Sequence, residues 1–317
     1  MRAAPRVRGE RLNSHPASPK PSADSGMTLE LVLGSLLLTT VWGMAQPVIK
    51  GAYAGVTPYA MIWMRCCAGV LTLTLYRLLM RIPESVTYHD PWREKGHRIL
   101  NACMHNAYVW FLYQGMFGTA AARASVLLYT QPVWVMLLSA LFLTGERITL
   151  VRALGFATAM AGTVTVFSNS LEAGGSMQAD FFILIAAAGW ATQSIHYRRY
   201  LSNSDVTSIA RWSMLIGAPT YFLLSFSQPD FGITHIGGPQ IFAVIYMGVI
   251  ASALLLAYWG HLLLRYSPAK ISVFFFMTPI VGVAGSALYL GEQLGWHLLI
   301  GAALTATGVW LVTGERR

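Results

Sequence analysis

The chain has 317 residues, of which 55% are hydrophobic and 11% charged, with a mean hydropathy of +0.52. A soluble domain is about a quarter charged, so this composition excludes an ordinary soluble enzyme or binding module. The formal net charge of +9 would suit nucleic-acid binding, but the positive residues are distributed as in a membrane protein. We therefore predict an all-α integral membrane protein in a lipid bilayer, with no nucleic-acid partner.

Residues 1–26 differ from the rest of the chain, because prolines mix with Arg and Ser without any apolar run. Such a composition predicts a disordered amino-terminal tail. The tail lacks the apolar segment of a secretory signal, and Glu10 and Asp24 disfavour an organelle transit peptide. The alternative is that translation starts at Met27, directly before the first apolar stretch.

Ten apolar stretches follow, each close to the ~20 residues that a helix needs to cross a bilayer. The loops between them are short and leave little room for a soluble catalytic domain. The 3 cysteines lie inside apolar stretches without metal-ligand or redox spacing, so we expect no metal and no cofactor. The predicted spans are residues 29–49, 57–79, 98–118, 122–144, 148–167, 180–199, 206–226, 239–260, 267–290 and 294–313.

The Lys and Arg residues outside these spans fall almost entirely on one side of the predicted membrane. With the amino terminus in the cytoplasm, only Lys50 and Arg123 lie on the outer side. Positive residues concentrate in cytoplasmic loops, so this bias predicts that both termini are cytoplasmic. Five spans per half is an odd number, and the second half therefore enters the membrane inverted. We predict two inverted five-helix repeats, over residues 28–167 and 179–314.

The two halves share a sequence motif. Each has a small-basic-small run, then a proline, a Gly-Glu pair and two spaced glycines. An internal repeat near half the chain length, within apolar sequence, is typical of secondary transporters. The copies consist of Ala122–Ser125, Pro132, Gly145, Glu146, Gly155 and Gly162, and of Ala269–Ser272, Pro279, Gly291, Glu292, Gly301 and Gly308.

The members of the motif are expected to have different roles. Pro132 and Pro279 lie near the middle of spans, where proline bends a helix and frees carbonyls that must be buried or line a cavity. Their matched positions favour two kinked helices around a cavity over ordinary membrane-helix prolines. The Gly-Glu pairs are predicted to be structural turns, with each glutamate at the amino end of the next helix. These turns are Gly145, Glu146, Gly291 and Glu292.

Small residues recur four apart in the fifth and tenth spans, a spacing that lets helix backbones approach closely. We expect these two spans to pack together or, alternatively, against a partner subunit in a homodimer. The residues are Gly155, Ala159 and Gly162 in one span and Gly301, Thr305 and Gly308 in the other.

Two arginines, Arg65 and Arg211, fall inside predicted spans and are functional candidates. Either could attract an anionic group such as a substrate carboxylate. The sequence favours the alternative, in which the long side chain reaches the nearer interface or a helix end. No acidic residue occupies the centre of a span, so His105 or His196 would serve any proton coupling. Facilitated diffusion or exchange fits equally well.

Polar and aromatic side chains inside the spans could line a pocket for a polar solute near the membrane midplane. Each alone is more often an interhelical hydrogen bond. The candidates for the substrate cavity are Gln46, His105, Trp110, Gln131, Pro132, Gln193, Tyr258 and Pro279.

Enzyme signatures are weak in this sequence. It has no P-loop, HExxH or GxSxG motif, and the SxxK match at Ser267 and Lys270 lacks its companion motifs. We therefore expect no enzymatic activity. The alternative of a lipid-modifying membrane enzyme would need clustered acids or histidines at a membrane face, and the sequence shows no such cluster. A non-transporting multi-pass receptor or scaffold stays open as a further alternative.

Together these residues resemble the EamA-type members of the drug/metabolite transporter superfamily. The doubled motif, Trp42-Gly43, Pro47, Arg65 after Pro58, and Trp190-Ala191 carry this resemblance over about residues 28–314. It implies a small-solute carrier of the bacterial cytoplasmic membrane, commonly an exporter of amino acids or other metabolites. The expected function is secondary transport of a small polar metabolite by alternating access. A sugar-phosphate or nucleotide-sugar carrier, from more distant relatives, is the alternative.

Overall fold

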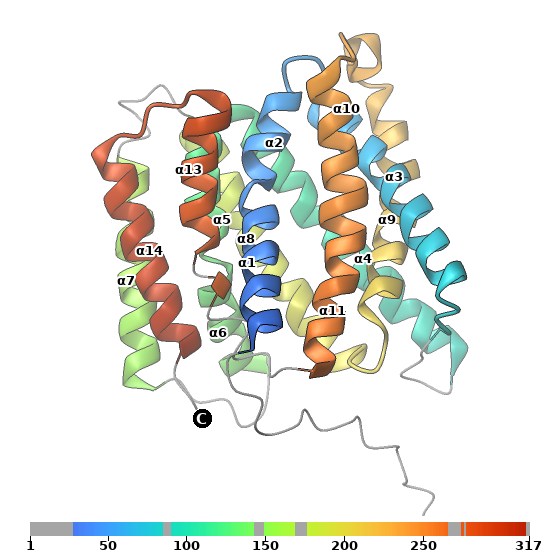
Figure 1. The fold of residues 1–317 in the computed structure, drawn as a ribbon, viewed down its shortest axis with the longest axis horizontal. Helices are drawn as coiled ribbons and strands as arrows, with labels where there is room; N and C mark the ends of the chain where they lie inside the picture. The colour runs from blue at the N-terminus through green and yellow to red at the C-terminus, as the bar shows by residue number, and fades with distance from the viewer. Residues whose placement is uncertain are drawn as a thin grey trace, which may run out of the picture.

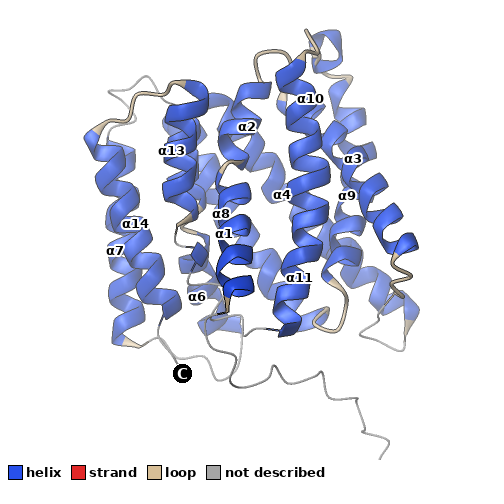
Figure 2. Cartoon of the chain, viewed as in Figure 1, coloured by secondary structure: helices blue, strands red, loops and turns tan. Residues whose placement is uncertain are grey.

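The structure is a computed structural model that describes residues 28–84, 90–142, 149–168, 176–265, 274–275 and 277–314. The tail over residues 1–26 and the turn at Gly145 and Glu146 lie outside the described residues. Within the described part all regular secondary structure is helical, and loops and one isolated β-bridge between Val56 and Ile233 make up the rest (Figure 2).

The helices stand side by side in one bundle, with α7 and α14 at one end and α3 and α9 at the other (Figure 1). In the amino-terminal half they are α1 Leu29–Gly43, α2 Ala45–Ala52, α3 Pro58–Leu79, α4 Pro91–Gly118, α5 Ala121–Leu128, α6 Gln131–Phe142 and α7 Leu150–Ser168. In the other half they are α8 Met177–Tyr200, α9 Val206–Ser225, η1 Pro229–Gly232, α10 Gly238–Val244, the π-helix η2 Ile245–Leu254, α11 Leu255–Arg265, α13 Thr278–Leu290 and α14 Trp296–Gly314.

Several helix starts are fixed by capping side chains. Thr28, Asp90, Ser176 and Asp205 each accept a hydrogen bond from a backbone N–H of the following first turn. Those N–H groups have no partner within their own helix, so a side-chain oxygen satisfies them. The caps therefore set where α1, α4, α8 and α9 begin.

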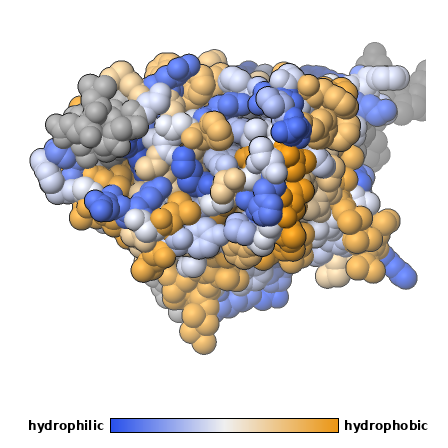
Figure 3. Space-filling view, turned by 90° about the horizontal axis from the view of Figure 1, so that it is seen from above, coloured by the Kyte–Doolittle hydropathy of each residue, from blue (hydrophilic) through white to orange (hydrophobic). Residues whose placement is uncertain are grey.

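The outer surface of the bundle suits a bilayer. Seen from one end, polar residues gather over the end of the molecule and hydrophobic residues surround it (Figure 3). Among the described residues, four helical stretches are long and apolar enough to cross a membrane: Leu29–Ala52, Pro58–Leu79, Ala121–Leu138 and Gly238–Leu262. The all-helical membrane class is thus confirmed, whereas the count of ten spans and their inversion stay predictions.

The predicted packing of the small-residue spans is confirmed, because α7 and α14 lie against each other along their length. At Gly162, an added Cβ would lie only 2.6 Å from Thr305 Oγ1 and 2.7 Å from the carbonyl oxygen of Gly301. Only glycine fits at such a backbone-to-backbone approach. This pair forms a close-packed edge of the bundle.

Two predicted spans are interrupted rather than simply bent. The first has a one-residue irregularity at Met44, between α1 and α2, where the hydrogen bonds from Met44 N–H to Thr40 and from Val48 N–H to Met44 are kept, and the fourth is irregular after α5, which ends at Leu128. Pro132 and Pro279 each occupy the second position of a new segment, α6 or α13, and do not lie inside a continuous helix. Proline is well tolerated there, since an N–H in the first turn has no intrahelical partner. The prolines therefore start helical segments, which refines the predicted kinks.

Candidate functional site

The interruptions of separate spans lie together and share hydrogen bonds. Tyr129, in the break between α5 and α6, donates its hydroxyl to the carbonyl oxygen of Trp42 at the end of α1 (3.1 Å). Tyr246 of the π-helix donates to the carbonyl of Val41 (2.7 Å), and Trp42 Nε1 donates to the carbonyl of Ala251 (3.1 Å). We call these five residues the helix-break junction. Its side chains donate to backbone carbonyls, which is one way in which polar groups at irregular helix positions are satisfied in membrane proteins.

The α13 segment approaches the same region. An added Cβ at Gly43 would lie 2.9 Å from the carbonyl oxygen of Thr278, so α1 and α13 touch through their backbones. Ser125 of α5 faces Gly282 of α13 closely as well. Segments from both halves of the chain thus meet at the helix-break junction.

Five of the predicted cavity residues belong to helices around this junction. Gln46 in α2 is buried, and its Oε1 has no hydrogen-bond partner. Gln131 is half-buried at the start of α6, and Pro279 is buried at the start of α13. Tyr258 of α11 is half-buried and stacks on His261 with ring centroids 6.2 Å apart. Pro132 follows Gln131 in α6, but its side chain is outside the described part.

The remaining cavity candidates lie on α4 and α8. The Nδ1 atom of His105 is 3.1 Å from the hydroxyl of Tyr108, and Trp110 Nε1 donates to the hydroxyl of Tyr59 at 3.4 Å. The ring of Tyr108 also stacks on Trp190 of α8. These aromatic contacts connect α3, α4 and α8.

Gln193 takes part in an interhelical hydrogen-bond network. Its Nε2 donates to Asn101 Oδ1 (2.7 Å), and Asn101 Nδ2 lies 3.1 Å from His196 Nδ1. His196 Nε2 in turn lies 3.4 Å from His97 Nδ1. This network joins α4 to α8 and satisfies the polar groups of both helices.

Arg65 lies inside the bundle, and its described contacts are with side chains of neighbouring helices. The residue is 4% exposed, its Nη1 donates to Ser252 Oγ of the π-helix at 3.4 Å, and its Cζ lies 5.3 Å from the ring centroid of Tyr113. Its Nε has no hydrogen-bond partner. Among the described residues, no Asp or Glu forms an ion pair with Arg65. Arg65 is buried because of the face of α3 on which it lies, and its depth along the helix does not determine this.

The ring of Tyr113 lies against this guanidinium, and further aromatic side chains are near enough to feel its charge. Besides Tyr113, it interacts electrostatically with Tyr108, Tyr221 and His105. We call Arg65 and these four residues the arginine–aromatic cluster. The hydroxyl of Tyr113 is buried and has no partner, so the cluster holds a second free polar group beside the Nε of Arg65.

Arg211 has different surroundings, because its Nη2 forms an ion pair with Glu84. The same carboxylate pairs with Arg98 Nη1 at 3.0 Å and accepts from Ser208 Oγ at 2.6 Å. Partial burial acts to raise the pKa of Glu84, but the Ser208 hydrogen bond and the nearby charges of Arg77 and Arg211 lower it overall.

Further ion pairs extend this network. Arg98 Nε pairs with Glu94 at 2.8 Å, and Arg77 pairs with Asp205. We call the whole network the ionic cluster. It joins the ends of α3, α4 and α9 and the loop at Glu84, and consists of Arg77, Glu84, Glu94, Arg98, Asp205 and Arg211.

The second Gly-Glu turn contacts the first half of the chain. Gly291 ends α13 with a left-handed φ of 68°, which glycine adopts without strain. The Glu292 carboxylate accepts the backbone N–H groups of Ala121 (2.9 Å) and Ala122 (3.0 Å). It therefore caps the amino end of α5 instead of the helix that follows it, α14. The unpaired first-turn N–H groups of α5 attract the anion.

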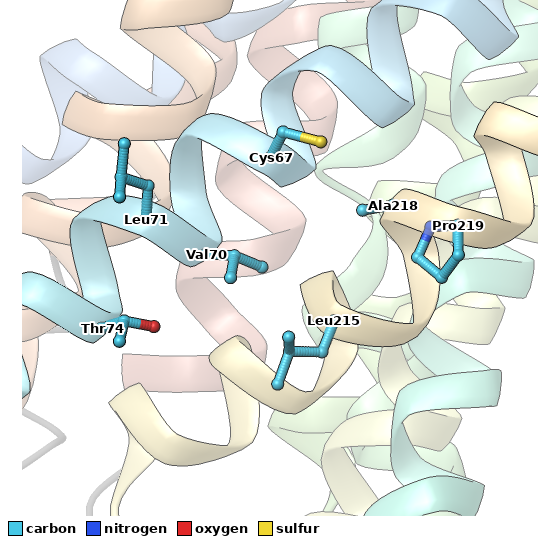
Figure 4. A pocket seen from close by; sticks show the side chains of 7 residues that line it. All are labelled: Cys67, Val70, Leu71, Thr74, Leu215, Ala218 and Pro219. Atoms are coloured by element: carbon cyan, nitrogen blue, oxygen red, sulfur yellow. The ribbon is translucent and has the colours of Figure 1, made fainter.

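A groove of about 430 Å³ lies between α3 and α9 (Figure 4). Its lining is apolar except for Thr74 and the thiol of Cys67, and Leu71 is 62% exposed. A polar solute needs convergent polar partners, which this groove does not supply. It belongs to the lipid-facing surface and contains no predicted cavity residue.

Sequence reasoning missed the tyrosines of the helix-break junction and of the arginine–aromatic cluster. Tyr129 lies three residues before Pro132, so the break that the proline predicts was a usable signal. Tyr246 carries no local signal, because its acceptor, Val41, is 205 residues away in the sequence. The same holds for Tyr221, whose hydroxyl donates to the carbonyl of Asn106.

Interrupted apolar helices, carbonyls held by side chains and a buried cation define a multi-pass membrane transporter. Comparison with known families identifies the transporter family. The chain belongs to the EamA-like transporter family, which it matches over residues 30–168 and 177–314. The resemblance seen in the sequence is thus confirmed.

Several relatives carry names that describe transporters or exporters. A protein of Escherichia coli strain K12 named "Probable amino-acid metabolite efflux pump" is 26% identical over 87% of this chain and 92% of its own. One of Streptantibioticus cattleyicolor, named "Probable terminal-alkyne amino-acid exporter", is 27% identical over 92% of this chain and 97% of its own. A solved crystal structure, 18% identical, covers 89% of this chain and 96% of its own with a TM-score of 0.63, which supports the fold alone.

Proposed function

We propose that this protein is a secondary transporter that exports a small polar metabolite, an amino acid or a related compound, by alternating access. The helix-break junction carries the proposal. Interrupted helices near the membrane midplane, with backbone groups held by side chains, are the sites where secondary transporters bind solutes. Here the interruptions of α1/α2 and α5/α6, the π-helix and α13 meet at one place.

The export direction and the substrate class rest on the relatives. Two of them carry names that refer to efflux or export of amino acids or their metabolites. We place the protein in the cytoplasmic membrane with both termini in the cytoplasm, because the positive residues outside the spans then lie almost entirely inside. A single cysteine introduced after residue 314 and labelled with a membrane-impermeant reagent tests that placement, since intact cells should leave it unlabelled.

In the proposed cycle, the halves of the chain move relative to each other around the helix-break junction. The interruptions at Met44 and before Pro132 are the positions at which the segments change angle. The close-packed α7 and α14 pair stays together, since Gly162 leaves no space for sliding. The candidate substrate-binding residues around the junction are Gln46, Gln131, Pro132, Tyr258 and Pro279. Further candidates on α4 and α8 are His105, Trp110 and Gln193.

Counterflow in proteoliposomes tests the function. Vesicles loaded with an unlabelled L-amino acid should accumulate the labelled form only when they contain the protein. Tyr129→Phe and Tyr246→Phe should each slow the initial rate about fivefold, because each loses one hydrogen bond, worth about 1 kcal/mol, at the junction. Tyr289→Phe, on an exposed tyrosine of α13, is the matched control.

Two outcomes would count against the proposal. Absence of counterflow for the common amino acids and their simple derivatives would refute transport of this class. Unchanged counterflow after His105→Ala and Gln131→Ala would refute the assignment of these two residues to the substrate path. Rates that do not change with pH or sodium would exclude coupling to either ion.

A further inference from the structure

Arg65 is a buried cation whose partner is not among the described residues of the chain. It is 4% exposed, and its contacts are a serine hydroxyl at 3.4 Å and the face of Tyr113. Burying a charge without a counter-charge costs free energy, and proteins normally supply an acid beside a buried arginine. A ligand that brings its own negative charge would supply the missing partner.

We propose that Arg65 binds the carboxylate of the transported solute, with the Tyr113 hydroxyl as a second donor. The proposal rests on the transport function proposed above and names the group by which the substrate is recognised. Both donors are free in the structure, since Arg65 Nε and Tyr113 Oη are buried without partners. A carboxylate has two oxygens and can accept from both groups at once.

The surroundings of Arg65 favour this class of ligand. Tyr113, Tyr108, Tyr221 and His105 interact with the guanidinium, and none of them is an acid. The positive charge is therefore not cancelled locally, and it would repel a solute that carries only an amine. Aromatic rings also contact apolar groups well, so a carboxylate next to an apolar or aromatic side chain fits the cluster.

The π-helix places Ser252 beside Arg65. A π-helical turn is uncommon and is frequently found at functional sites. Here the π-helix, Ile245–Leu254, packs on α3 and contributes both Ser252 to the arginine and Tyr246 to the helix-break junction. A solute bound at Arg65 would therefore contact an element that also holds the interrupted α1.

Binding to the purified full-length protein in detergent tests the proposal with a matched pair of probes. L-phenylalanine carries the carboxylate, and L-phenylalaninamide has an uncharged amide at the same position. The wild type should bind the acid at least about 10-fold more tightly than the amide, the usual effect of losing a charged hydrogen bond. Arg65→Gln should remove this preference, Arg65→Lys should keep part of it, and Tyr113→Phe should reduce it by less.

Arg211→Gln is the matched control, because Arg211 lies in the ionic cluster and should leave the acid-to-amide ratio unchanged. A purely structural role for Arg65 would lower the melting temperature of Arg65→Gln, whereas we expect the melting temperature without ligand to stay the same or rise. Equal binding of acid and amide by the wild type, binding of neither, or an unchanged ratio in Arg65→Gln would overturn the proposal. Tighter binding of glycerol 3-phosphate than of L-phenylalanine would overturn the assignment to a carboxylate.

Counterflow separates this inference from the transport function. Acid-selective binding without counterflow would refute transport and leave the carboxylate site standing. Counterflow of the acid at wild-type rate by Arg65→Gln would refute the site and leave transport standing.

Discussion

Arg98 and Arg65 are equally buried, at 4% exposure each, but their surroundings are opposite. Arg98 is paired with Glu94 at 2.8 Å and Glu84 at 3.0 Å and donates to Ser208 at 2.6 Å. Arg65 has one long hydrogen bond to a serine and the face of a tyrosine ring. In the ionic cluster the chain provides the counter-charges, and the arginines hold helix ends together. In the arginine–aromatic cluster it provides none, which leaves the guanidinium available for a ligand.

The largest effect on stability should come from removing Arg98, the arginine that is paired with acids. Arg98→Met should lower the free energy of unfolding by about 3–5 kcal/mol, because it removes the cation that pairs with the buried carboxylate of Glu94. Arg65→Met should lower it by far less, since no acid is left behind. Thermal unfolding of both variants in the same detergent measures the difference, and Glu94→Leu added to Arg98→Met should recover most of the loss. Equal destabilisation by the two arginine variants would show that Arg65 is also structural.

The second effect comes from giving Arg65 an internal partner. Ser252→Asp places a carboxylate where Ser252 Oγ lies 3.4 Å from Arg65 Nη1. The new charged hydrogen bond should stabilise the protein by about 2 kcal/mol and should abolish binding of L-phenylalanine. Ser252→Asn, of the same shape without the charge, should do neither. Full ligand binding by Ser252→Asp would contradict the carboxylate site.

A smaller effect is expected at Glu292, a carboxylate whose partners are backbone N–H groups. Glu292→Ala should cost about 1 kcal/mol, because it removes the cap of α5 at Ala121 and Ala122. The neighbouring exposed residue allows a control, Gln293→Ala, which should be neutral. Chemical unfolding of both variants measures the loss, and a neutral Glu292→Ala would show that water replaces the cap without cost.

The smallest effect concerns the pH dependence of the ionic cluster. The pKa of Glu84 is lowered in the folded state, so its contribution to stability is complete above the unfolded value of 4.5 and is lost as pH falls through the folded value. Because Glu84 is partly exposed, the contribution should be below about 1 kcal/mol. The melting temperatures of wild type and Glu84→Gln should therefore differ at pH 7 and converge below pH 4.5. A constant difference would contradict the assignment.

Features set by local spacing could be predicted from the sequence, and those set by distant contacts could not. Small residues three or four apart define one helix face, so the contact of α7 with α14 followed from Gly155, Ala159, Gly162 and their repeats. Pro132 marked an interruption, because proline removes a backbone donor wherever it lies. The partner of Glu292 could not be predicted, since Ala121 is 171 residues away. The contacts of Arg65 could not be predicted either, because its depth in a span does not say which face of the helix points inward.

One property of the helix-break junction bears on how the protein could move. The carbonyls of Val41 and Trp42 are held by the hydroxyls of Tyr246 and Tyr129, which sit on side chains that can rotate. A backbone N–H in a helix is rigidly fixed, so turning a segment away from it would break the bond. A tyrosine hydroxyl can swing with its acceptor over small angles. In the proposed transport cycle, we therefore expect the interruption in α1/α2 to act as a hinge. Bending there would change the rotamers of the two tyrosines while the carbonyls of Val41 and Trp42 keep their hydrogen bonds.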